Sequence, residues 1–295
     1  METALIAARF VHITALVMLF GAALFPFYAY NNGDAARWPE GARLQKLHIA
    51  ASLLALLGAL AWFAITTRII TGSAAPADLW LVARKTQFGM LWGARLLLLV
   101  FLAIPLAMMK LHKTRAWIEM LVAGVLLATL AGTGHAQGGQ SDGMHWSADI
   151  MHLLAAGAWL GGLLPLCFAL SEQSETGDIL LRFSTMGVVA VATLVTTGLI
   201  NALYLVGSVK ALFHTGYGLL LVGKLGLFAV MLMLAARNRF TLMPQLAENS
   251  LSAHSRLIRT VLAEQCIGFC LLLVVAMLGT MEPAINTYAA QAVMP

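Results

Sequence analysis

The amino-acid sequence predicts an all-α membrane protein with eight transmembrane helices. Of its 295 residues, 60% are hydrophobic and only 11% are charged, and the mean hydropathy is +0.85. A soluble globular domain does not have this balance, so the lipid bilayer is the expected solvent for most of the chain. Apolar runs of about 20 residues, the length that crosses the hydrocarbon core as a helix, predict spans at 5–28, 45–66, 88–109, 116–134, 147–170, 183–206, 216–236 and 257–280.

The first apolar run has the features of a retained transmembrane helix. It has neither the basic segment before it nor the small-residue cleavage site after it that mark a signal peptide. The connections between the runs are short and leave no room for a separate soluble domain. Three cysteines, Cys167, Cys266 and Cys270, fall within predicted spans, so no disulfide framework is expected.

Basic residues gather on one side of the predicted bundle. The loops after the second, fourth, sixth and eighth spans hold few of them: Arg68, Arg84, Lys85 and Lys210. The other loops hold Arg37, Arg43, Lys46, Lys110, Lys113, Arg115, Arg182, Arg237, Arg239, Arg256 and Arg259. The positive-inside rule then places both termini on the outer side, the periplasm of a bacterial inner membrane. The net charge of +5 is therefore a topology signal, and nucleic acid is not an expected partner.

Internal similarity predicts two tandem four-helix repeats. Aligning ARFVHITALVMLFGAALFP of the first span with ADIMHLLAAGAWLGGLLP of the fifth pairs His12 with His152, Arg9 with Asp149, and Gly21 with Gly161. The starts of the third and seventh spans pair Thr86 with Thr215, Gly89 with Gly218, and Arg95 with Lys224. Because four is an even number, both repeats keep the same orientation, related by an axis along the membrane normal. We expect one repeat over 1–134, a periplasmic histidine-containing loop over 135–146, and the second repeat over 147–295.

The segment 133–162 carries the strongest functional signal. His145, Asp149 and His152 are spaced i, i+4, i+7, so they share one stripe if a helix begins near Met144. His135 lies in a glycine-rich loop that can fold over the helix end, and Met151 is the neighbour of His152. Imidazole suits copper, zinc, iron and nickel, and methionine sulfur selects Cu(I). We expect a metal site formed by His135, Met144, His145, Asp149, Met151 and His152.

The role of Asp149 has three interpretations from sequence. Its carboxylate binds the metal directly, accepts the second N–H of an imidazole ligand, or pairs with Arg9 or Lys224. Ionisable residues within a membrane are costly and need partners. We expect the remaining ones to hold the bundle through buried ion pairs or to mark a gate: Arg9, Arg95, Glu119, Lys224 and Glu264.

An alternative use of the matched histidines is haem binding. His12 and His152 lie at comparable depth on two spans, which is the minimum for bis-histidine ligation of haem b in a membrane bundle. This hypothesis makes the chain a b-type cytochrome or a cupric reductase. We find none of the sequence motifs of a phosphate-binding loop, a nucleophile elbow or a zinc protease, so catalysis is not expected.

The sequence resembles the CopD (copper resistance D) family of bacterial inner-membrane proteins. The resemblance rests on TGHA at 133–136, DIMHLLAAGAWLGGLLPL from Asp149, RFS at 182–184, TGLINALY at 197–204, YGLLLVGKLGLF at 217–228, AARNR at 235–239 with Pro244, VLAE at 261–264 and GTMEP at 279–283. These matches cover mainly the second half of the chain. The first half agrees in hydropathy and through Arg95.

The resemblance implies an eight-span protein that takes up copper and works beside a separate periplasmic copper-binding protein of the CopC type. It also implies that His135, Asp149 and His152 are copper residues, whereas His145 is added from spacing. We therefore expect a copper site on the periplasmic side and a route inward between the two repeats. The alternative to transport is a scaffold that only loads copper onto partner proteins.

Overall fold

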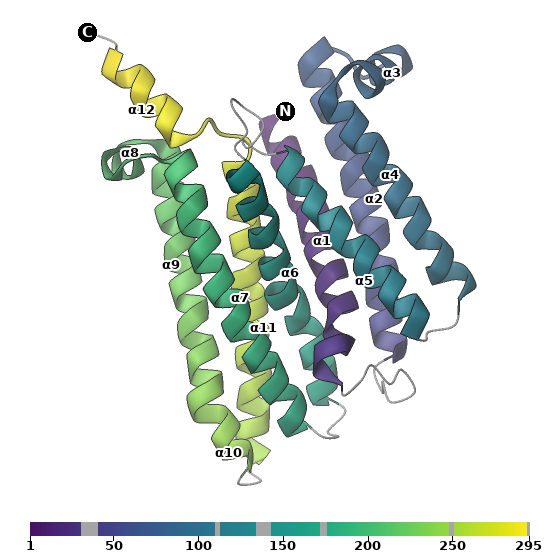
Figure 1. Ribbon diagram of the computed structural model, residues 1–295, viewed down its shortest axis with the longest axis vertical. Coiled ribbons are helices and arrows are strands. Elements are labelled where there is room, and N and C mark those ends of the chain that lie inside the picture. Colours follow the sequence, from purple (N-terminus) through teal and green to yellow (C-terminus); the bar gives the residue numbers. More distant parts are fainter. Residues whose placement is uncertain (31–40, 110–112, 134–142, 172–175, 248–250, 294–295) are drawn as a thin grey trace.

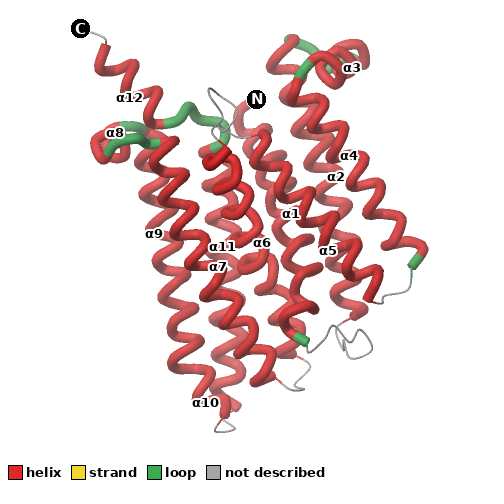
Figure 2. Tube along the Cα trace, in the orientation of Figure 1, coloured by secondary structure: helices red, strands yellow, loops and turns green. Residues whose placement is uncertain are grey.

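The computed structural model describes residues 1–30, 41–109, 113–133, 143–171, 176–247 and 251–293 (Figure 1). These residues form helices and no strands (Figure 2), and eight of the helices are long and apolar enough to cross a membrane, which confirms the expected fold class. The long helices are α1 (Glu2–Ala29), α2 (Gly41–Thr71), α4 (Gln87–Met108), α5 (Lys113–Ala128), α6 (Gly143–Ser171), α7 (Thr176–Leu205), α9 (Gly216–Arg237) and α11 (Leu251–Leu278). Shorter elements are α3 (Pro76–Lys85), η3 (Thr129–Thr133), α8 (Val209–His214), the π-helical turn η5 (Asn238–Leu242), α10 (Met243–Ala247) and α12 (Ala284–Val293).

Helices α1 and α6 form the centre of the bundle (Figure 1). Helices α2, α4 and α5 lie on one side of this pair, and α7, α9 and α11 lie on the other. The most apolar windows of α1 and α6 are 72% and 67% buried, whereas that of α9 is 6% buried. Leu97, Leu203 and Met233 are exposed on the outer helices. Apolar side chains on every face are the pattern of helices that contact lipid.

Small residues bring α1 and α6 into close contact. A Cβ atom added to Gly21 would lie 2.5 Å from the carbonyl oxygen of Gly157 and would overlap the backbone of Gly161. The two helices therefore pack backbone to backbone, as small residues four apart allow in membranes. Gly21 and Gly161 are a pair from the sequence alignment, so the predicted repeats meet at equivalent positions.

Two equivalent corners lead into α4 and α9. The Thr86 hydroxyl donates to the Val82 carbonyl (2.7 Å) and accepts from the Gly89 amide (2.9 Å). The Thr215 hydroxyl donates to the Ala211 carbonyl (2.7 Å) and accepts from the Gly218 amide (3.0 Å). Each threonine thus caps a long helix directly after a short one. This local geometry agrees with duplication, although the tandem repeat as a whole stays a prediction.

Both ends of the chain lie at the same end of the bundle, together with α3, α8 and α12 (Figure 1). We call this the outer end, following the sequence-based orientation, and the opposite one the inner end. Helix α6 begins at Gly143. The last residues of the expected 135–146 loop therefore form the first turn of α6, and 134–142 lie outside the described residues.

Candidate metal-binding cavity

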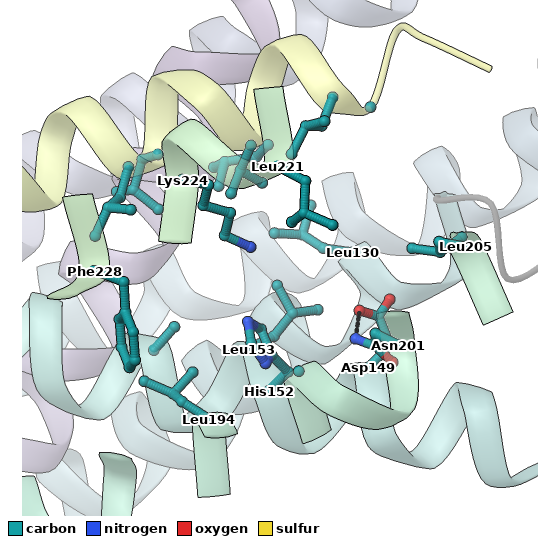
Figure 3. A pocket seen from close by; sticks show the side chains of 18 of the residues that line it. Leu130, Asp149, His152, Leu153, Leu194, Asn201, Leu205, Leu221, Lys224 and Phe228 are labelled. Carbon is teal, nitrogen blue, oxygen red and sulfur yellow. Dashed lines mark hydrogen bonds between the residues drawn. The ribbon is translucent and has the colours of Figure 1, made fainter. Parts of the chain in front are cut away.

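A cavity of about 530 Å³ lies at the outer end, between α1, α6, α7, α9 and α11 (Figure 3). One stripe of α6 forms its most polar wall, and this stripe consists of His145, Asp149, His152, Ala156 and Trp159. The stripe forms because α6 begins just before Met144, as the i, i+4, i+7 spacing requires. Leucine, valine and isoleucine side chains supply much of the remaining wall.

Hydrogen bonding fixes the protonation pattern of the His152 ring. Its Nδ1 lies 3.0 Å from the Thr197 hydroxyl oxygen, and that hydroxyl donates its only proton to the Thr193 carbonyl at 2.6 Å. Thr197 must therefore accept from His152, so Nδ1 carries the hydrogen of the neutral ring. Nε2 is left with a free lone pair on a residue that lines the cavity, which is the form in which a neutral imidazole binds a metal.

Asp149 lies one turn from His152 on the same wall. Its carboxylate accepts a hydrogen bond of 3.3 Å from the Asn201 side-chain amide on α7 (Figure 3). The Asn201 Oδ1 atom is buried and accepts no hydrogen bond within the described part of the chain. The cavity wall thus holds an imidazole nitrogen, a carboxylate and an amide oxygen close to one another.

Lys224 extends from α9 into the same cavity (Figure 3). It is near enough to interact electrostatically with both Asp149 and His152. No ion pair within 4 Å joins it to an acid among the described residues. Lys224 and Asp149 therefore interact electrostatically across the cavity and form no direct ion pair.

His145 lies near the start of α6 and is held by an aromatic stack. Its ring lies 4.5 Å from that of Tyr204, with 2° between the two planes. The residue lines the cavity and is 8% exposed. Within the described residues, however, no group of three histidine, cysteine, aspartate or glutamate side chains is positioned to hold a metal ion. His135 lies outside those residues.

The two methionines expected at the site lie elsewhere on α6. Met144 and Met151 are 56% and 51% exposed, and neither lines the cavity. Each directly precedes a histidine in the chain. However, adjacent residues point about 100° apart around a helix with 3.6 residues per turn. Proximity in sequence placed them near the histidines, whereas helical periodicity turns them to the outer surface of α6.

His12 does not line the cavity that His152 lines. Its Nδ1 bonds to the Ala55 carbonyl on α2 (2.8 Å), and its ring packs 5.9 Å from Trp62 and 6.0 Å from Trp92. The His152 Nδ1 lies instead beside Thr197 on α7. Haem binding by the two histidines stays a prediction.

Arg9 and Arg95 are held mainly by aromatic rings and neutral groups. The guanidinium of Arg9 lies 4.4 Å from the Trp62 ring centre, and that of Arg95 lies 4.3 Å from that of Trp92. Arg95 also donates to the Thr129 hydroxyl (2.8 Å) and carbonyl (2.6 Å). Cation–π contacts of this kind stabilise a desolvated guanidinium.

Glu119 and Glu264 lie toward the inner end in different environments. Glu119 accepts from Arg115 (2.5 Å) and lies 3.1 Å from His48 Nδ1, so its basic neighbours are Arg115 on its own helix and His48 on α2. Glu264 accepts a short hydrogen bond from Asn238 in the π-helical turn. The i, i+4 spacing of Arg115 and Glu119 was a readable signal for the first pair. Asn238 carried no comparable signal.

Sequence reasoning also missed the residues that position the α6 stripe. Thr197 and Asn201 are both on α7, four residues apart, and Tyr217 lines the same cavity from α9. Polar residues spaced i, i+4 in an otherwise apolar span were the available signal. Their pairing with His152 and Asp149 depends on how α6 and α7 pack, which the linear pattern does not contain.

Comparison with known proteins identifies the family. The model for Copper resistance protein D matches residues 177–278, and that for Copper resistance protein D-like, N-terminal domain, matches residues 1–146. Copper resistance protein D of Pseudomonas syringae pv. tomato is 34% identical, and the alignment covers 94% of this chain and 96% of that protein. Inner membrane protein YebZ of Escherichia coli (strain K12) is 30% identical over 94% of this chain and 98% of its own length.

A third relative is longer. Copper transport protein CutJ of Bacillus subtilis (strain 168) is 30% identical over 94% of this chain, which spans 53% of that protein. No solved structure matches. The two family models together cover most of the chain, and two relatives align with it over nearly their full lengths, so the chain belongs to the copper resistance protein D family.

Proposed function

We propose that this protein binds copper in the outer cavity and transports it across the bacterial inner membrane toward the cytoplasm. Two relatives are named for copper resistance and copper transport, and a third is named an inner membrane protein. Membership of the same family and eight apolar spans support the same cargo and membrane for this chain. The absence of any recognised catalytic motif in the sequence favours transport over catalysis.

The observation that carries this proposal is the state of His152. The Thr193–Thr197 hydrogen-bond relay leaves its Nε2 lone pair available on the cavity wall. Asp149 and the unpartnered Asn201 oxygen lie on the same side of the cavity. Nitrogen and oxygen donors together suit Cu(II), and we propose that His145 and His135 complete the ligand set when copper is bound.

Lys224 fits this function because it interacts electrostatically with Asp149 across the cavity when no metal is bound. A copper ion that binds Asp149 takes over this role and repels Lys224 toward the α9 wall. The lysine thereby keeps the site ready for a cation without occupying the position of the metal.

The orientation follows from the charge distribution, and the partner follows from the family resemblance. With the basic loops in the cytoplasm, the outer cavity opens toward the periplasm. We propose a separate CopC-like copper-binding protein as the donor on that side. A scaffold that receives copper there and returns it to other proteins is the second candidate. It differs from the transporter only in whether copper crosses the membrane.

Purified protein in detergent, compared with His152→Ala and with the matched control His214→Ala, tests the site. His214 is an exposed outer-end histidine on α8 that does not line the cavity. We expect the wild type and His214→Ala to bind copper in chelator competition, and His152→Ala to bind at least about tenfold more weakly, as loss of a metal ligand implies. Equal binding by His152→Ala would reject the site.

Uptake of copper into proteoliposomes that contain a copper-sensitive dye separates the remaining candidates. Transport predicts uptake by the wild type and little by His152→Ala. Binding without uptake would replace the transporter by the loading scaffold. An absorption spectrum of the same sample with a Soret band lost in His152→Ala would replace both by a haem protein.

A further inference from the structure

A second cavity, of about 580 Å³, lies toward the inner end of the second four-helix unit. Its walls come from the last half of α6, the first half of α7, the end of α9 with η5, and the first half of α11. The outer cavity uses the opposite halves of the same four helices. Because these helices run side by side along the bundle (Figure 1), the two cavities are stacked along its length.

The Trp159 indole separates the two cavities. Among the described residues, it is the single side chain that lines both. It is 2% exposed, and its ring packs edge-on against Phe228 with 6.1 Å between the ring centres. Trp159 follows His152 by seven residues on the stripe of α6, so the partition lies two turns inward from the candidate ligand.

The inner cavity holds an acid without a basic partner. Glu264 lines it, is 2% exposed and accepts from Asn238, whose own side-chain oxygen accepts from Thr260 at 2.5 Å. Arg239 lines the same cavity but donates to Ser184. No salt bridge to Glu264 is found among the described residues. Glu119 on α5, in contrast, has two basic neighbours.

A buried acid with no basic partner among the described residues offers its two carboxyl oxygens to a cation that enters the cavity. The π-helical turn that brings Asn238 to Glu264 is a backbone irregularity of the kind that clusters at functional sites. Oxygen donors alone hold copper less tightly than a set containing imidazole. The inner cavity therefore has the chemistry of a release position, while the outer cavity has the chemistry of an acceptor.

In contrast to the two cavities, the interface between the two halves of the molecule is closely packed. At the crossing of α1 and α6 the backbones touch at Gly21 and Gly161. A route between the repeats, which the sequence suggested, would have to pass this contact. The inner cavity instead lies within the second unit. The outer cavity lies between the second unit and α1, and Trp62 and Leu130 of the first unit also line it.

We propose that the cation crosses within the second four-helix unit, from the His152–Asp149 wall past Trp159 to Glu264, and that the Trp159 indole is the barrier that keeps the two cavities apart. This inference rests on the proposed transport function for its cargo. The barrier itself does not depend on copper and can be tested without it.

Cysteine accessibility tests the barrier. In a background with Cys167, Cys266 and Cys270 replaced by alanine, Ala202→Cys reports on the outer cavity and Ser184→Cys on the inner one. A membrane-impermeant thiol reagent is applied to right-side-out and inside-out vesicles. We expect Ala202→Cys to react from the outer side only, and Ser184→Cys from the inner side only.

Adding Trp159→Ala should make Ser184→Cys react from the outer side at least fivefold faster, while the conservative Trp159→Phe should not. Outer-side labelling of Ser184→Cys with Trp159 in place would overturn the proposal. So would unchanged labelling in Trp159→Ala when each cysteine still reacts from its native side. Neither result depends on whether copper is the cargo.

Glu264→Gln tests the release position, with Asp178→Asn, an exposed acid near the start of α7, as its control. We expect Glu264→Gln to bind copper within twofold of the wild type while proteoliposome uptake falls at least tenfold. Full uptake by Glu264→Gln would remove Glu264 from the route. If the proposed copper-binding function is wrong, His152→Ala binds copper as well as the wild type does. If only the proposed route is wrong, Glu264→Gln keeps full uptake, so the two failures are distinguishable.

Discussion

At the scale of single residues, the candidate site depends on which ring nitrogen of His152 carries the proton. The Thr197 hydroxyl makes this choice because its own proton is already used by the Thr193 carbonyl. Partners that orient a metal-binding histidine typically change metal affinity by 10- to 100-fold when removed. The Thr197 side chain on α7 is therefore expected to affect the copper affinity of His152 on α6.

Replacing Thr197 by valine tests this relay. Valine keeps the shape and removes the oxygen that accepts from Nδ1, so the ring loses its fixed tautomer and orientation. We expect copper affinity to fall about tenfold in chelator competition, with little change in thermal stability. Thr196→Val is the matched control, because the Thr196 hydroxyl is exposed and donates only to the Ala192 carbonyl. An equal loss in both variants would contradict the relay.

At the scale of helices, the contact between α1 and α6 organises the bundle. Two helices related by the predicted repeat cross where neither has a side chain. Helices α2, α5, α7 and α11 pack against this pair, and α4 and α9 lie farther out (Figure 1). Lipid supplies no hydrophobic drive for helix association, so close backbone packing is a main source of stability in such a bundle.

Gly161→Ala should therefore destabilise the protein. The new methyl group would lie 2.9 Å from Gly21 Cα and would overlap the Val17 carbonyl, which forces the helices apart. Overpacking of this kind costs about 1–3 kcal/mol. We expect a lower midpoint of thermal unfolding in detergent. Gly226→Ala on α9, where no atom lies within 4 Å of the added Cβ, should leave the midpoint unchanged. Equal midpoints for the two variants would show that the crossing tolerates separation.

Sequence reasoning predicted the helices better than the contacts between them. The eight spans follow from hydropathy, and the α6 stripe follows from helical periodicity, because both are properties of one segment. The family resemblance is confirmed by the comparisons. The partners of His152 and Glu119 come from other helices, and no pattern along one segment specifies them. Met144 and Met151 do not line the cavity, because residues adjacent in the chain point in different directions around a helix; their role as metal ligands stays a prediction.

At the scale of the whole molecule, the two halves differ in how they fill equivalent space. In the first half, Trp62 and Trp92 pack against His12 and close the region around it. In the second half, the corresponding region around His152 is a cavity, which is also lined by Arg9 and Trp62 of the first half. The first half has the character of a packed support, and the second half supplies most of the walls of both cavities.

The orientation of the molecule is a prediction from charge and is directly testable. Both termini lie at the outer end of the bundle, so fusions at both termini should report the same compartment. We expect alkaline phosphatase fused after the C-terminus to be active and green fluorescent protein at the same position to be dark. A fusion after Ser171, the last residue of α6 at the opposite end of the bundle, should give the reverse. Fluorescence from the C-terminal fusion would invert the assignment of outer and inner.

The composition of the outer cavity has a consequence for how copper reaches it. Aliphatic and aromatic side chains cover most of its wall, and the polar groups are concentrated on α6 and its partners. An aquated ion would have to give up its hydration shell against this surface before any ligand replaced the lost water, which is costly for a divalent cation. Exchange from the ligands of a docked donor protein, one bond at a time, avoids the bare ion altogether. For the proposed function, the apolar wall of the cavity favours delivery of copper by a donor protein over capture of hydrated metal ions from free solution.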